Sequence, residues 1–287
     1  MSETQIIENW TEVISPKKNL FDVRLKEVWR YRDLIFLFVK RDIIAQYKQT
    51  VLGPLWNIIQ PILTTIMFMI VFNKIAGIST DKLPPVLFYM SSITIWNYFS
   101  ACLTTASSTF TVNANIFGKV YFPRLALPIA SVVSNMARFG IQFALLLSVI
   151  IYYQLTNKYF IQIGWHTLLI PLIAIEMALL GLGLGIIISS LTTKYRDFTV
   201  LITFGVQLLM YITPVAYPLS FLQKSGYKNF IQWNPLSPLV EGFRYAVFGV
   251  GTVNTTLFLY SAGFTLISLF AGIIIFNKVE RNFMDTV

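Results

Sequence analysis

Six long apolar runs constrain the fold of this chain more than any other feature of its sequence. Each run approaches the length that a helix needs to cross a membrane, about 20 residues for a hydrocarbon core of about 30 Å. The runs cover residues 55–72, 85–106, 129–154, 168–191, 198–217 and 256–276. Backbone groups in hydrocarbon must satisfy one another, and a helix does so internally. The sequence therefore predicts an all-helical integral membrane protein with six spans.

The composition supports this fold class and argues against a nucleic-acid partner. Of the 287 residues, 55% are hydrophobic and 12% are charged, whereas soluble domains average about 25% charged residues. The net charge is +9, but nine of the 22 Lys and Arg residues precede Gly53. Basic residues beside a span ordinarily set topology and contact anionic lipid. We therefore expect membrane lipid as a partner, and no nucleic acid.

The distribution of basic residues also predicts the orientation of the chain. Six spans place both termini on one side, where six further basic residues join the nine that precede Gly53. The opposite side holds six basic residues, and Arg138 lies within a span. The positive-inside rule then places both termini in the cytoplasm. The acidic start of the chain lacks the apolar core of a signal peptide, so no cleavage is expected there.

Residues 24–53 are predicted to form an amphipathic helix and a turn, between a polar extension (1–23) and the six-span domain (54–287). Apolar side chains recur at helical spacing along one face. They are Leu25, Val28, Trp29, Phe36, Val39, Ile43 and Tyr47. Gly53 and Pro54 then interrupt the helical pattern directly before the first apolar run. The segment is either a basic flank that sets topology or a lever between a cytoplasmic partner and the first span.

The loop after the second run, NANIFGKVYFPRLALP, is short, basic and unusually apolar. A loop that only reverses direction has no need for Phe117, Tyr121 and Phe122 together. Two interpretations remain open, a docking surface for a partner and an aromatic belt at the lipid headgroups.

The segment from 218 to 253 contains apolar stretches that are too short to span a membrane, which favours re-entrant or interfacial helices. There Glu241 and Arg244 have the spacing of a helical ion pair, worth about 0.2–0.5 kcal/mol if exposed.

Two charges, Arg138 and Glu176, fall near the middle of the third and fourth runs. Charges inside a membrane are costly, so each needs a reason to be there. We predict that the two form a structural ion pair between neighbouring helices. A proton relay is the alternative, but it usually uses several acidic groups, and these runs hold one.

Motifs for catalysis and metal binding do not occur in the sequence. No G-x-x-x-x-G-K-[ST] is present, so this chain is not expected to hydrolyse nucleotide through a P-loop. Its one histidine, His166, and one cysteine, Cys102, lack the clustered ligands of a metal site. Gly181, Gly183 and Gly185 lie within a span, where they favour close helix packing rather than dinucleotide binding. We therefore expect no catalytic residue, cofactor or metal in this chain.

Several segments of the sequence resemble those of a known family, the membrane subunits of ABC-type polysaccharide exporters, which include the O-antigen and teichoic-acid permeases. The resemblance rests on RDIIAQYKQTVLGPLWNIIQP, GKVYFPRLALP, TKYRDF, and ITPVAYPLSFL followed by WNPLSPLVEGFR, in that order. It covers the chain from about residue 30 onward. It implies a homodimer in the bacterial inner membrane that rests on two copies of a cytoplasmic ABC ATPase, which would bind ATP and Mg. The cargo implied is a lipid-linked glycan, carried in a channel at the dimer interface.

The resemblance also implies roles for particular segments. The amphipathic helix (residues 24–47) and the loop between the second and third spans (residues 113–124) would contact the ATPase. Residues 219–249 would form an outer gate. The ATPase-coupling residues would then be Asn113, Phe117, Lys119, Tyr121, Phe122 and Arg124. Arg41 or Lys48, beside the first span, would recognise the lipid pyrophosphate.

A glycan offers hydroxyls and apolar sugar faces, so its channel would need aromatic and small polar side chains. Aromatic candidates occur in the first, second and fifth runs, although many of them would equally face lipid or other helices. They are Phe68, Phe72, Tyr89, Trp96, Tyr98, Phe99, Tyr211 and Tyr217.

Other functions are weaker on the sequence. An exporter of a lipid, drug or teichoic acid on the same fold is the nearest alternative. A secondary transporter would call for inverted repeats or a central ionisable site, and a membrane enzyme would call for a clustered acid, base or metal site. No internal repeat and no clustered acid, base or metal site is found in the sequence.

Overall fold

The computed structural model describes residues 25–48, 52–113, 116, 122–157, 159, 164–192, 197–224, 226, 228–251 and 253–282. Within these residues every regular element is a helix, which agrees with the all-helical prediction. Five stretches are long and apolar enough to cross a membrane. They are Gly53–Ile75 (η1, α3 and η2), Pro85–Ser107 (α4), Ala126–Leu155 (α7), Trp165–Thr192 (η3 and α8) and Thr255–Val279 within α12, Thr255–Asn282.

The helix observed in the fifth apolar run is shorter than the predicted span. Helix α9 spans Phe198–Ile212, which is 15 residues, whereas the apolar run extends to residue 217. The helix ends because Pro214 follows Thr213, and a residue before proline is driven toward extended backbone. Thr213 has φ −93° and ψ 141°, as this restriction requires. Tyr217 therefore lies beyond the helix, where its hydroxyl donates to the carbonyl of Tyr211.

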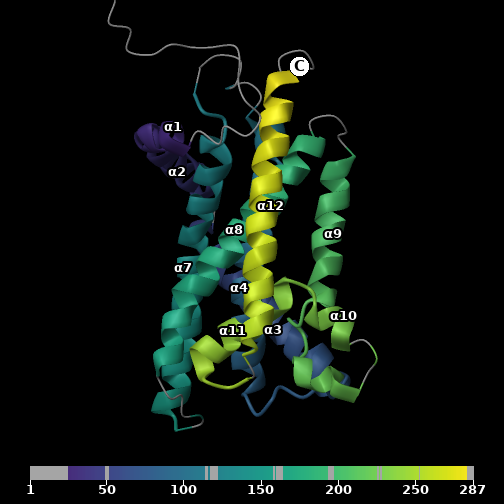
Figure 1. Cartoon of the computed structure of the whole chain (residues 1–287). Helices are drawn as coiled ribbons and strands as arrows, with labels where there is room; N and C mark the ends of the chain where they lie inside the picture. The colour runs from purple at the N-terminus through teal and green to yellow at the C-terminus, as the bar shows by residue number, and fades with distance from the viewer. Residues whose placement is uncertain are drawn as a thin grey trace, which may run out of the picture.

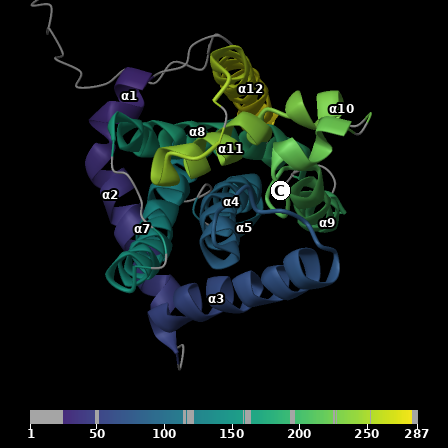
Figure 2. The same ribbon diagram turned by 90° about the horizontal axis from the view of Figure 1, so that it is seen from below.

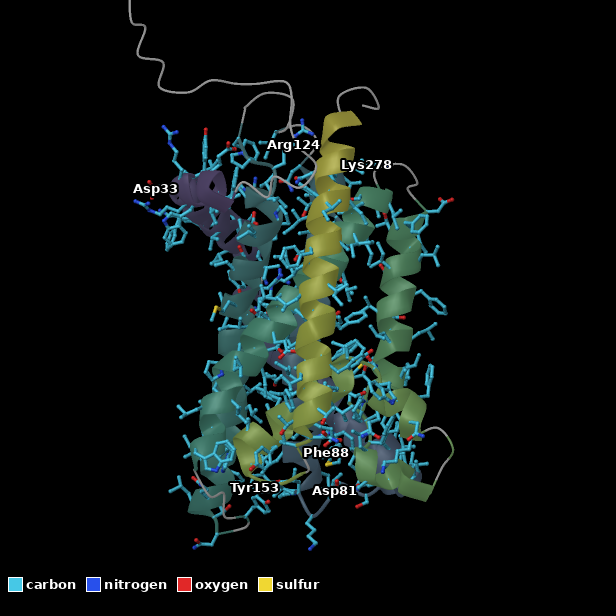
Figure 3. All side chains as sticks on the ribbon, in the orientation of Figure 1. Asp33, Asp81, Phe88, Arg124, Tyr153 and Lys278 are labelled. Atoms are coloured by element: carbon cyan, nitrogen blue, oxygen red, sulfur yellow. The ribbon has the colours of Figure 1, made fainter. Side chains whose placement is uncertain are left out.

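The helices pass back and forth between two ends of the bundle (Figures 1 and 3). Asp33, Arg124 and Lys278 mark one end, and Asp81 and Tyr153 lie toward the other; we call these the Arg124 end and the Asp81 end. Near the Arg124 end, α1 (Leu25–Arg30) and α2 (Arg32–Tyr47) lie beside α7, and α5 (Thr109–Val112) follows α4. Figure 2 shows α4 at the centre, with α3, α7, α8 and α9 around it.

Helix α8 (Leu169–Thr192) packs closely against both α4 and α12 at three of its glycine residues. A Cβ placed on Gly185 would lie 2.5 Å from Ala106 Cβ of α4, and one on Gly181 would lie 2.8 Å from Cys102 Cβ of the same helix. A Cβ on Gly183 would lie 2.9 Å from the backbone nitrogen of Leu269 in α12. Positions two apart point to opposite sides of a helix, so alternate glycines serve two neighbours. The predicted close packing at these glycines is confirmed.

The Asp81 end is capped by short helices, η4 (Leu219–Lys224), α10 (Lys228–Gln232) and α11 (Leu236–Phe248). Arg244 of α11 bonds Glu241 Oε1 at 2.5 Å, Ser92 Oγ of α4 at 2.8 Å and the Pro214 carbonyl at 2.8 Å. Its guanidinium also lies 4.4 Å from the Phe88 ring centroid. The Arg244 and Glu241 side chains are only 3% and 10% exposed. The predicted pair exists, but it is buried and joins α11 to α4, so removal of either partner would leave a buried charge unpaired.

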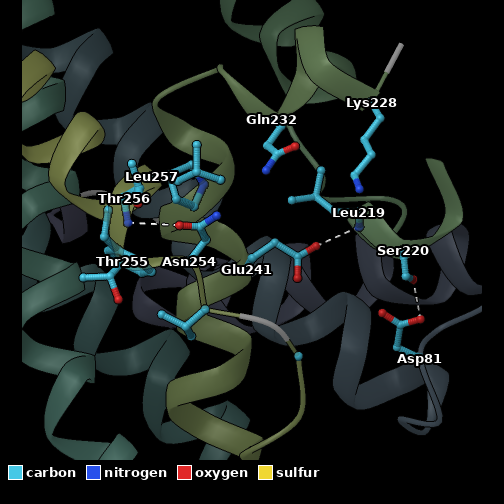
Figure 4. Close-up of a pocket in the computed structure, with 14 residues that line it drawn as sticks. Asp81, Leu219, Ser220, Lys228, Gln232, Glu241, Asn254, Thr255, Thr256 and Leu257 are labelled. Atoms are coloured by element: carbon cyan, nitrogen blue, oxygen red, sulfur yellow. Dashed lines mark hydrogen bonds between the residues drawn. The ribbon is translucent and has the colours of Figure 1, made fainter. Parts of the chain in front are cut away.

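Glu241 has a second partner on the capping segment. Its Oε1 accepts a hydrogen bond from the Leu219 backbone at 2.9 Å, and nearby Ser220 donates to Asp81 (Figure 4). A cavity of about 560 Å³ lies between these groups and the start of α12. The short helices of the Asp81 end are thereby tied to both α4 and the loop that precedes it.

The glycine contacts predict the effect of one added methyl group. Gly183→Ala and Gly185→Ala are each expected to lower the free energy of unfolding by about 1–3 kcal/mol, because the methyl group overlaps a neighbouring helix. Gly140→Ala on α7 is the matched control, since nothing lies within 4 Å of its added Cβ. It should be neutral or stabilising by up to about 1 kcal/mol. Equal thermal unfolding of all three variants in detergent would refute the packing described.

Candidate functional site

A band of polar side chains runs between α3, α4 and α7 in an otherwise apolar bundle. We name it the polar seam, and it lines a cavity of about 280 Å³. Its lining residues are Asn57, Gln60, Asn97, Tyr98, Ser100, Ala101, Thr104, Thr105, Asn135, Arg138, Phe139 and Gln142. Most of them carry an amide or a hydroxyl, and Tyr98 and Phe139 add aromatic rings. Amides and hydroxyls both donate and accept hydrogen bonds, so the lining suits a ligand rich in hydroxyls.

Helix periodicity places these side chains on common faces. On α7, Asn135, Arg138 and Gln142 are three and four residues apart, so they lie above one another toward α4. Gln142 Oε1 accepts a hydrogen bond from Asn97 of α4 at 3.3 Å, and Asn135 donates to Thr105 Oγ1 at 2.9 Å. The seam is therefore held by direct contacts between α4 and α7.

A second cavity, of about 350 Å³, continues the seam toward α2. The two cavities share Thr105, Asn135 and Arg138, so Arg138 stands where they meet. The α2 side chains that face the second cavity are Arg41, Asp42, Ala45 and Gln46. Tyr47 at the end of α2 also accepts a hydrogen bond from Asn57 of α3 at 2.8 Å, which joins α2 to the first cavity.

The structure does not bring Arg138 and Glu176 together. Arg138 faces the polar seam, whereas Glu176 of α8 interacts with Ser261 of α12. Arg138 Nε and Glu176 Oε1 are both buried with no hydrogen-bond partner among the described residues. The predicted ion pair is not formed, because α7 and α8 present these two charges to different neighbours.

The predicted headgroup residues have different surroundings. Arg41 is engaged, since its Nε and an Nη atom donate to Asp42 Oδ1 at 2.9 and 2.7 Å and its guanidinium lies 4.9 Å from the Phe38 ring. Lys48 is exposed at the end of α2. Arg41 therefore already has a counter-charge, and Lys48 lies outside both cavities of the seam.

The ATPase-coupling prediction is not tested by the structure of the single chain, and Phe117, Lys119 and Tyr121 lie outside the described residues. Among the rest, Phe122 is buried against Phe38 of α2, with ring centroids 5.6 Å apart. Asn113 is buried and accepts a 3.4 Å hydrogen bond from Arg41. Arg124 is half-buried at the Arg124 end of the bundle. The two segments predicted separately, the amphipathic helix and the loop, are thus in contact.

Most of the predicted channel aromatics pack into the core of the single chain. Tyr89, Trp96, Tyr98 and Phe99 of α4 are buried, and Phe68 and Phe72 are half-buried beside them. Only Tyr98 of the eight lines the seam. Tyr211 is exposed on α9, and burial raises the pKa of the Tyr217 hydroxyl to about 12, so it remains a hydrogen-bond donor. The prediction overlooked the amide side chains, whose helical spacing on the third run around Arg138 was the available signal.

Comparison with known proteins identifies the relatives of the chain. The family described as "ABC-2 type transporter" matches residues 33–248. An O-antigen export system permease protein RfbA from Klebsiella pneumoniae is 28% identical over 255 residues, which cover 88% of this chain and 94% of that protein. A protein of the same name from Myxococcus xanthus is 24% identical over 264 residues, covering 92% and 98%. The polysialic acid transport protein KpsM from Escherichia coli is 22% identical over 246 residues, covering 84% and 91%.

The separation of Arg138 from Glu176 predicts additive behaviour. Arg138→Gln and Glu176→Gln should change the free energy of unfolding independently, and the double variant should equal their sum within about 0.5 kcal/mol. Glu241→Gln is the positive control, because it breaks the buried pair with Arg244 and should cost about 3–5 kcal/mol. Thermal or denaturant unfolding in detergent measures all four variants. Rescue of either single change by the other would restore the ion-pair interpretation.

Proposed function

Because the chain belongs to the ABC-2 type transporter family, we propose that it is the permease subunit of an ATP-driven exporter of a lipid-linked polysaccharide. The observation that carries this proposal is the polar seam. Amides, hydroxyls and two aromatic rings line a cavity inside a bundle whose composition is otherwise that of a membrane protein. A glycan presents hydroxyls and apolar sugar faces, which these groups match. The names of the relatives, O-antigen and polysialic acid transport proteins, agree with such a cargo.

We propose that the working unit is a homodimer in the bacterial inner membrane. A polysaccharide needs a continuous path, and the two cavities of the seam are small, about 280 and 350 Å³. Helices α3 and α9 flank α4 and carry large exposed apolar side chains, among them Leu63, Met67, Phe204 and Leu208. In a dimer these faces would meet the second copy and enclose the path, with α9 as the sixth crossing. The positive-inside rule places the Arg124 end in the cytoplasm, together with both termini.

The energy source would be a separate subunit. The sequence has no P-loop, so two copies of a cytoplasmic ABC ATPase, holding ATP and Mg, would supply the driving force. The junction of α2 with Phe122 and Asn113 lies toward the Arg124 end, where such a subunit would dock. Because α2 also bonds α3 through Tyr47 and Asn57, a displacement of α2 would reach the seam directly.

An exporter of a lipid, drug or teichoic acid on the same fold is the second candidate. A purely apolar cargo would leave the amides of the seam unsatisfied during transit, which is costly in a low-dielectric environment. The lining of the seam therefore favours a hydroxyl-rich cargo.

The proposed division of labour predicts where ATP is hydrolysed. The chain purified alone should show no ATP hydrolysis above background, and co-expression with its partner ABC ATPase should yield an active complex. In cells lacking their own permease, the two subunits together should restore surface polysaccharide, and neither alone should do so. An ATPase variant that cannot hydrolyse ATP is the control. ATP turnover by the lone chain, or surface glycan that appears without the ATPase, would contradict the proposal.

A further inference from the structure

Arg138 is a cation within a membrane-spanning helix. The one carboxylate that lines its cavities, Asp42 of α2, interacts with it electrostatically but pairs directly with Arg41. Arg138 lies on α7 at the junction of the two cavities and lines both. Its Nε is buried without an acceptor, and no ion pair involving it occurs in the part of the chain that the structure describes. An ionised group inside a membrane is costly and ordinarily faces a partner or a water-filled cavity.

The acidic groups of the described residues do not form an ion pair with Arg138. Asp42, the carboxylate that lines the second cavity, is held by Arg41 through two hydrogen bonds. Glu176 faces Ser261 of α12. The first cavity contains no acidic residue at all among its lining side chains. The seam is therefore a hydrogen-bonding cavity in which Arg138 has no directly paired carboxylate among the described residues.

The groups around Arg138 suit a polar anion. Asn135 and Gln142 lie one turn away on either side along α7. Asn135 lines both cavities with Thr105 of α4, and Gln142 lines the first cavity. An arginine guanidinium binds phosphate oxygens through paired N–H groups, and neutral amide donors can complete the coordination. Beyond these residues the lining continues with Asn97 and Gln60, which would contact sugar hydroxyls.

We propose that Arg138 binds the phosphate or diphosphate group that joins the glycan to its lipid carrier. This inference rests on the proposed function and assigns its anion site to the seam rather than to Arg41 or Lys48. The diphosphate would pair directly with the Arg138 guanidinium. The first sugars would lie along the amides of α4 and α7. Specificity for a phosphorylated lipid would follow, because a neutral lipid would leave Arg138 unpaired.

The test is equilibrium binding of farnesyl diphosphate, compared with farnesol, to the full chain in phosphatidylcholine nanodiscs. Wild-type protein should bind the diphosphate at least about tenfold more tightly than the alcohol, since charged hydrogen bonds are lost in the latter. Arg138→Gln should remove that preference, and Arg138→Lys, which keeps the charge but not the paired donors, should retain part of it. Arg32→Gln is the matched control, because it removes an exposed arginine on α2 and should change nothing.

Several outcomes would overturn the inference. Equal binding of farnesol and farnesyl diphosphate by wild-type protein would do so even if Arg138→Gln failed to fold. An undiminished preference in Arg138→Gln or a complete loss in Arg32→Gln would place the anion site elsewhere. Equal displacement of the probe by phosphatidylglycerol would make it an ordinary headgroup site. Export of surface polysaccharide by the wild-type complex, measured in parallel, would show that the proposed function stands when this inference fails.

Discussion

The approach of α8 to α4 and α12 at glycine is the contact on which the arrangement of the other helices depends. Because Gly181 and Gly185 lack side chains, α8 lies directly against the backbone of α4, and Gly183 allows the same toward α12. Helix α4 is thereby fixed at the centre of the bundle, covered on one side by α8 (Figure 2). Its remaining side faces α3 and α7, and there the sequence places amides and hydroxyls. A packing constraint on one face of α4 thus determines where the polar seam lies.

Two junctions connect this scaffold to its ends. Toward the Arg124 end, α2 is joined to the following elements by the contact between the Phe38 and Phe122 rings and by the hydrogen bond between Tyr47 and Asn57. At the Asp81 end, Arg244 and Glu241 tie α11 to α4 and to the segment after α9. Both junctions include groups that touch α4 or a helix lining the seam. A transporter driven from one end needs such continuous contacts if a displacement at that end is to reach the cargo path.

The sequence predicted the helical class, the close packing at the glycines and the pairing of Glu241 with Arg244. These depend on apolar length, on residue size and on spacing within one helix, all of which are local. It did not predict that the Glu241–Arg244 pair is buried, nor that Arg138 and Glu176 are apart, because both depend on how neighbouring helices are rotated about their axes. The seam was missed for a related reason. Aromatic residues were weighed as channel candidates, whereas most of them fill the core, and the amides on the face of Arg138 line the cavity.

The central claim, that a lipid-linked glycan passes along the polar seam, is tested most directly by photo-crosslinking. A photoreactive phenylalanine analogue would replace Phe139, which lines the seam, or Phe270, which is exposed on α12 away from it. The complex would carry an ATPase that binds but does not hydrolyse ATP, so that cargo is held in transit. The account predicts that glycan is crosslinked at position 139 and not at position 270. Equal crosslinking at both positions, or crosslinking only at position 270, would contradict it.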